Sequence, residues 1–111
     1  MKKFVALYLG PQPPREAATP DQKTIAAGMA AWSQWMRDHA QAIVDSGGPL
    51  GKTKRIAADG ITDTKNRVAA YVVVEAQSHE AAARMFEGHP HFTIFPGDSV
   101  EIMECLPIPG Q

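Results

Sequence analysis

The stretch Val68-Ala69-Ala70-Tyr71-Val72-Val73-Val74-Glu75-Ala76 is the most apolar run of the chain and is rich in β-branched residues. Such a run favours a central strand, because both of its faces can then be covered by other parts of the protein. The stretch from Lys3 to Leu9 also alternates between two apolar faces. We therefore expect central strands at residues 3–9 and 68–76.

A helix is expected between these two strands. Thr19-Pro20-Asp21-Gln22 has the composition of a helix start, with the threonine as the cap and proline at the first helical position. The helical pattern continues to Ser46, and Gly47-Gly48-Pro49 predicts its end. Met29, Trp32, Met36, His39 and Ile43 are spaced so that they share one face of this helix.

Three further segments complete the pattern. Lys52 to Ala58 is interpreted as a second strand and Val100 to Leu106 as the last one, while Ser78 predicts the cap of a helix from His79 to Glu87. The resulting order, β-α-β-β-α-β over residues 1–111, predicts a single α+β domain of ferredoxin-like topology, with two helices on one face of a four-stranded antiparallel sheet. Apolar residues on the other face predict a homodimer in which the two sheets face each other.

Composition excludes several classes of protein. The net charge is −1, so the strongly basic surface of a nucleic-acid-binding domain is absent and no nucleic acid partner is expected. The chain contains one cysteine, Cys105, and no apolar segment long enough to cross a membrane, which together favour a cytoplasmic protein. It has no phosphate-binding or dinucleotide-binding glycine motif and no zinc-finger spacing, so no cofactor is expected.

Several stretches, in this order and spacing, carry a family resemblance: Phe4 to Tyr8, Met29 to Trp32, Gly47 to Leu50, Asp59-Gly60, Tyr71 to Ala76, Ser78 to Ala83, His89-Pro90 and Val100 to Ile102. The pattern resembles the YCII-related family, including its branch named for an Asp-Gly-Pro-Phe motif. The resemblance implies a dimeric, ferredoxin-like α+β barrel. The motif itself is missing, and only Asp63-Thr64-Lys65 is similar to the residues that follow it in the family.

The resemblance does not bring a catalytic pair with it. Some members carry a histidine in the first helix and an acidic residue near the last loop, proposed as a catalytic dyad. Here the histidine position falls at or beside Ala31-Trp32, and His89 stands at the acidic position. The dyad is therefore not carried over to this chain.

His89 and His91 flank Pro90 in a loop, and they are our candidate acid and base. Histidine transfers protons near neutral pH and is also the commonest metal ligand. Asp63 is the third candidate, because it could orient a polar substrate. The alternative is a surface turn, since no third ligand with zinc spacing accompanies the two histidines.

The first helix supplies candidates for the wall of a substrate pocket. Trp32 and Trp35 could stack on an aromatic ligand, although Trp32 is also suited to anchor the helix in the core. His39 shares their face and is equally suited to be a satisfied core or interface histidine. Lys65 and Phe92 complete the candidates, with a solvated turn as the alternative for Lys65.

Two functions remain open. One is a small-molecule enzyme with acid/base chemistry of the lyase or isomerase kind on an aromatic or enol-like compound, in which His91 or His89 moves the proton. The other is a dimeric ligand-binding or regulatory module without catalysis, which the missing dyad favours.

Overall fold

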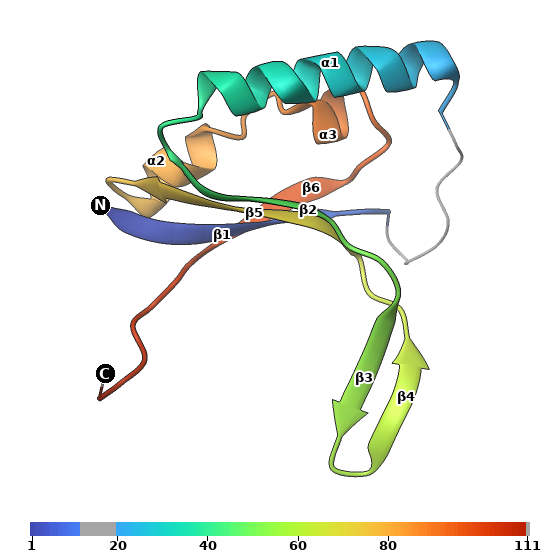
Figure 1. Ribbon diagram of the computed structural model, residues 1–111, viewed down its shortest axis with the longest axis vertical. Coiled ribbons are helices and arrows are strands. Elements are labelled where there is room, and N and C mark those ends of the chain that lie inside the picture. The colour runs from blue at the N-terminus through green and yellow to red at the C-terminus, as the bar shows by residue number, and fades with distance from the viewer. Residues whose placement is uncertain (12–19, 111) are drawn as a thin grey trace.

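The structure is a computed structural model that describes residues 1–11 and 20–110. Its elements are β1 (Lys2–Leu9), α1 (Gln22–Asp38), β2 (Ile43–Pro49), β3 (Thr53–Ala57), β4 (Gly60–Thr64), β5 (Val68–Ala76), α2 (His79–Arg84), α3 (Pro90–Thr93) and β6 (Ser99–Glu104). Strands β2, β5, β1 and β6 form, in that order, a four-stranded antiparallel sheet. The helices cover one face of it (Figure 1). The expected α+β fold with central strands β1 and β5 is confirmed.

The first helix is shorter than its sequence pattern predicts. Asp21 is its cap and accepts a hydrogen bond from the Thr24 backbone N–H at 2.8 Å; the expected cap, Thr19, lies outside the described residues. The predicted extension to Ser46 is wrong, because α1 ends at Asp38 and the chain continues as β2. Pairing with β5 stabilises this strand, through Ile43 opposite Val74 and the Glu75 N–H to the Ala42 carbonyl at 2.8 Å.

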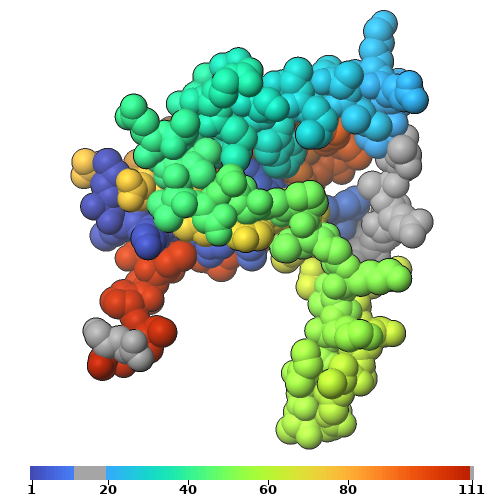
Figure 2. Space-filling view, in the orientation of Figure 1, coloured from blue at the N-terminus to red at the C-terminus, as the bar shows by residue number. Residues whose placement is uncertain are grey.

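The segment predicted as the second strand of the sheet lies outside that sheet. Strands β3 and β4 pair only with each other and form a hairpin between β2 and β5. Figures 1 and 2 show that this hairpin projects from the body on the side opposite the helices. Ile56 and Ile61 stand opposite each other in it and are 72% and 68% exposed. Residues 60–64 form its second strand.

The core lies between the sheet and the helices. Phe4, Ala6 and Tyr8 of β1 alternate inward with Val72 and Val74 of β5, and all five are buried. Trp35, Ala82 and Phe86 pack onto them from the helical side. Ser78 caps α2 as predicted, since its side chain accepts a hydrogen bond from the Ala81 N–H at 3.1 Å.

The residues that alternate outward belong to the uncovered face of the sheet. Val5 pairs with Val73 and Met103 across the three neighbouring strands, and Leu7 pairs with Tyr71. In the described ranges, no helix is both long enough and apolar enough to cross a membrane.

Candidate functional site

A cavity of about 340 Å³ lies between α1 and the sheet. Its walls are mainly apolar and aromatic; Trp32 comes from α1, and Phe95 comes from the segment that follows α3. Helix α1 and Phe95 approach closely because residue 28 is a glycine; a Cβ there would collide with the Phe95 ring. The described residues that line the cavity are Tyr8, Met29, Trp32, Met36, Ser46, Gly48, Pro49, Ala69, Ala70, Tyr71, Val72, His91 and Phe95.

His91 is the titratable imidazole in this wall. It lies in α3, where Pro90 takes the first position and His89 is the cap residue. The His91 side chain is buried, and its Nε2 donates a hydrogen bond to the Leu9 carbonyl at 2.8 Å. A carbonyl can only accept, so the hydrogen is at Nε2 and the neutral ring has its lone pair at Nδ1. The neutral ring can therefore accept a proton only at Nδ1.

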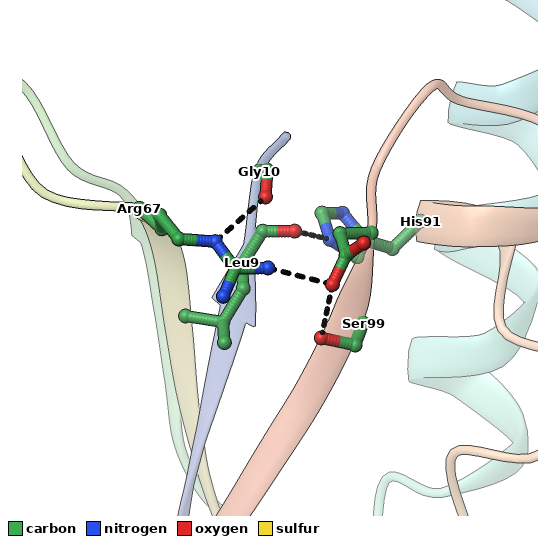
Figure 3. Close-up of polar contacts among 6 residues, drawn as sticks. Leu9, Gly10, Arg67, His91 and Ser99 are labelled. Carbon is green, nitrogen blue, oxygen red and sulfur yellow. Dashed lines mark hydrogen bonds and ion pairs between the residues drawn. The ribbon is translucent and has the colours of Figure 1, made fainter. Parts of the chain in front are cut away.

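The end of β1 is held in place on the other side of His91 (Figure 3). The Leu9 carbonyl also accepts the Asp98 backbone N–H at 3.0 Å. Asp98 pairs with Arg67 at 2.6 Å, and the Arg67 Nε donates to the Gly10 carbonyl at 3.3 Å. These contacts tie β1, β5 and the start of β6 together, and they fix the carbonyl that orients His91.

His89 lies deeper, with no exposed surface. Its Nδ1 accepts the His91 backbone N–H at 3.0 Å, and its Nε2 lies 3.2 Å from the Tyr8 hydroxyl. Trp32 and Trp35 enclose the ring, with centroids 4.6 Å and 4.8 Å away. Both nitrogens are engaged, and nowhere in residues 1–11 and 20–110 do three His, Cys, Asp or Glu side chains gather as a metal site would require.

Burial, followed by the smaller effects of charge on His91 and His39, lowers the pKa of His89 to about 4. Burial also raises the pKa of Tyr8. At neutral pH both side chains are therefore uncharged. Neither reaches solvent, so the structure gives His89 no direct route for proton exchange.

Acid is expected to destabilise the fold through His89. Its pKa is lower in the folded protein than in the unfolded chain, so the unfolded chain takes up the proton first as the pH falls. The contribution of neutral His89 to the free energy of unfolding is fully present above about pH 6.5. It is lost progressively as the pH falls to 4, by about 3 kcal/mol in total. Urea unfolding between pH 4 and 7 measures this, with His89→Gln as the control that no longer titrates. Equal pH dependence in both proteins would contradict the prediction.

The other candidates on α1 separate into two groups. Trp32 lines the cavity, whereas Trp35 is a core residue whose indole N–H donates to the Met85 carbonyl at 2.8 Å. His39 follows the helix, its ring lies 4.5 Å from that of Trp35, and its Nδ1 is 2.9 Å from the Trp35 carbonyl oxygen. Trp35 and His39 are not among the residues that line the cavity.

The remaining candidates lie elsewhere in the chain. Asp63 is on the hairpin and pairs with Lys54 at 2.6 Å, and Lys65 follows the same strand in an exposed position. Phe92 is half-exposed and lines a different cavity, of about 420 Å³, beside α2 and β6. Within one chain, the structure therefore brings together His91, His89, Trp32 and Trp35 from the predicted set, and of these only His91 and Trp32 line the cavity.

Tyr8 is the residue of this site that the sequence analysis missed. The sequence places it in the strand expected at residues 3–9, with no sign of a role in a site. The available signal was chemical: a tyrosine on a strand face that is buried needs a hydrogen-bond partner for its hydroxyl group. Its partner, His89, is 81 residues away in the sequence.

Comparisons with known proteins bear on the fold. No family model matches the chain, and no curated protein matches it. Among solved structures, the chain is similar to 5-chloro-2-hydroxyhydroquinone dehydrochlorinase (TftG) from Burkholderia phenoliruptrix, solved in complex with 2,5-dihydroxybenzoquinone. The TM-score is 0.55 at 16% sequence identity, over 91% of this chain and 90% of that one. The protein therefore shares the α+β fold of this dehydrochlorinase.

Proposed function

We propose that the protein binds a small hydroxylated ring compound in the 340 Å³ cavity and removes a proton from it with His91. The observation that carries this proposal is the orientation of His91. Its Nε2 is committed to the Leu9 carbonyl, and its ring forms part of the wall of an apolar, aromatic cavity. A small apolar cavity with few polar groups is typical of a ligand site.

The class of ligand follows from the walls. Trp32 and Phe95 offer aromatic faces, and most of the other lining side chains are apolar, which suits a flat ring. The similar dehydrochlorinase was solved with a dihydroxybenzoquinone, which supports the same class of ligand here. We also propose that the chain is a divergent relative of the YCII-related proteins, on the residue pattern described above.

The chemistry assigned to His91 is general base catalysis. Its Nδ1 takes the proton of a ring hydroxyl or enol, and the electron pair moves into the ring. His91 returns this proton to a ring carbon, which gives the keto isomer of the ligand. Where that carbon carries a leaving group such as chloride, His91 then takes a second hydroxyl proton; the electrons of that O–H bond move through the ring, and chloride departs with the electrons of its bond to carbon. The Leu9 carbonyl stabilises the positive imidazolium that forms, because Nε2–H continues to donate to it.

The test is a titration with 2,5-dihydroxybenzoquinone, monitored by tryptophan fluorescence and by melting temperature. Ligand in the cavity should quench Trp32 and raise the melting temperature in a saturable way. Ala70→Leu fills the cavity from the sheet and should abolish both signals, whereas Ile25→Leu on the exposed part of α1 should leave them unchanged. Absence of saturable binding to the wild type would refute the proposal.

A second candidate function is ligand binding without turnover. None of the described side chains that line the cavity is an Asp, Glu, Lys or Arg, so His91 has no charged catalytic partner there. A binding or regulatory module needs none. Saturable quinone binding without chloride release from 5-chloro-2-hydroxyhydroquinone would favour this function.

We further propose that a second copy of the chain covers the open face of the sheet. Val5, Leu7, Tyr71, Val73 and Met103 form an apolar band there. The hairpin and the C-terminal tail both project on this side (Figure 1), and they carry exposed isoleucine and leucine side chains. An isolated two-stranded hairpin has little stability of its own, so contacts with a partner would stabilise it.

Val73→Glu is expected to weaken the proposed dimer at least about tenfold, because it would bury an unpaired carboxylate at the centre of the interface. Light scattering after size-exclusion chromatography at micromolar concentration measures the mass. Ile25→Glu, on the helical side, should leave the mass unchanged. A wild-type protein that is monomeric under these conditions would exclude the dimer.

A further inference from the structure

The hydrogen bonds around His89 determine which of its nitrogens carries the hydrogen. The backbone N–H of His91 can only donate, so Nδ1 of His89, 3.0 Å away, must present its lone pair. A neutral imidazole with a lone pair at Nδ1 has its hydrogen at Nε2. The contact between Nε2 and the Tyr8 hydroxyl, 3.2 Å long, is therefore donated by His89 and accepted by Tyr8.

This direction has a consequence for Tyr8. A tyrosine hydroxyl has one hydrogen, and that hydrogen cannot point at a nitrogen that is itself donating. Tyr8 is 1% exposed, so its side chain has little contact with water. Among the described residues, no other group is hydrogen-bonded to the Tyr8 oxygen, and Tyr8 lines the 340 Å³ cavity. The hydroxyl hydrogen is thus available to an atom inside the cavity.

We propose that His89 is a positioning residue that makes the Tyr8 hydroxyl a hydrogen-bond donor to a ligand oxygen, so that the cavity selects rings bearing a carbonyl or phenolate oxygen. This inference deepens the proposed function and rests on it for the identity of the ligand. It also assigns different roles to the two histidines, since His91 contacts the ligand and His89 acts through Tyr8.

The arrangement suits the proposed chemistry. The rings of Tyr8 and His91 lie 5.2 Å apart, so the donor and the base occupy one region of the wall. When His91 removes a proton from the ligand, negative charge develops on a ring oxygen. A fixed donor at that position stabilises the charge, as the donors of an oxyanion hole do. Tyr8 keeps its own hydrogen, because burial raises its pKa.

The first arm of the test needs no ligand. Nitrogen-15 NMR of labelled histidine side chains distinguishes the two neutral tautomers and the charged ring. We expect His89 to be neutral with its hydrogen at Nε2 at pH 7, and its signals are identified by their loss in His89→Gln. A His89 that carries its hydrogen at Nδ1, or that is charged at pH 7, would overturn the proposal.

The second arm compares two ligands, 2,5-dihydroxybenzoquinone and the oxygen-free ring indene. Tyr8→Phe should weaken quinone binding about tenfold or more, since a hydrogen bond to a charged acceptor is lost, and should change indene binding less than about threefold. Equal weakening for both ligands would mean that Tyr8 only packs, and would overturn the proposal.

Two further outcomes separate this proposal from the proposed function. Wild-type protein that binds indene but not the quinone would overturn the selection of oxygen while leaving a ring-binding cavity. Wild-type protein that binds neither would refute the proposed function and the ligand selection together, and the tautomer would still be decided by NMR.

If Tyr8→Phe does not fold, 3-fluorotyrosine in a Tyr71→Phe background labels Tyr8 alone. Compared with unlabelled Tyr71→Phe protein, this stronger donor should tighten quinone binding and leave indene binding unchanged; unchanged quinone affinity would overturn the proposal.

Discussion

Replacement of His91 by alanine is expected to slow turnover of a hydroxylated ring substrate by about 10²–10⁴-fold, the usual contribution of a positioned general base. The variant removes Nδ1, the proton acceptor, and leaves the apolar walls of the cavity in place. Release of chloride from 5-chloro-2-hydroxyhydroquinone gives kcat, and 2,5-dihydroxybenzoquinone gives the affinity. We expect the loss to appear mainly in kcat.

His79→Ala is the matched control, because His79 is exposed and does not line the cavity. Its kcat should equal that of the wild type. An His91→Ala protein that retains the wild-type kcat would show that His91 is not the base. The ligand-binding function would then be the one to pursue.

The second large effect is expected at Gly47. This residue adopts φ +60° at an irregularity in the pairing of β2 with β5, and a Cβ there would collide with the Tyr71 backbone carbonyl. Side chains are disfavoured at such a φ, and a backbone atom cannot move aside without disrupting the strand pair. Gly47→Ala should therefore lower the free energy of unfolding by about 4 kcal/mol.

Gly48→Ala provides the comparison one residue away. Its Cβ would meet no atom within 4 Å, and its φ is not positive, so the change in stability should stay within about 1 kcal/mol. Urea unfolding of the two variants beside the wild type measures the difference. Similar stabilities for Gly47→Ala and Gly48→Ala would contradict the conformation described for β2.

The strands with strong local signals were predictable from the sequence. The β-branched run at 68–76 and the two-sided apolar run at 3–9 became β5 and β1, and Ser78 caps the helix that it was expected to cap. The boundary between α1 and β2 was not predictable in the same way. Ile43 continues the helical spacing of Trp32 and Met36, and only its pairing with Val74, a non-local contact, makes it part of a strand.

Residue type and position pointed to part of the cavity wall, but not to the contacts that orient it. His91 and Trp32 were suggested by residue type and position, and both line the cavity. The sequence could not show that the Leu9 carbonyl orients His91, because that contact spans 82 residues. Asp63 was a candidate because it precedes the central strand and could orient a polar substrate. The hairpin instead places Asp63 beside Lys54.

The β3–β4 hairpin also has a practical use. Its two ends leave the sheet side by side, because the Leu50 N–H bonds to the Ala69 carbonyl at 2.9 Å where β2 and β5 meet. Residues 51–65 can therefore be regarded as an exchangeable segment, which a short linker or a reporter peptide could replace while the four-stranded sheet keeps its connectivity and Arg67 keeps its contacts with Gly10 and Asp98. Chimeras made at this junction would show whether ligand binding in the cavity depends on the projecting hairpin.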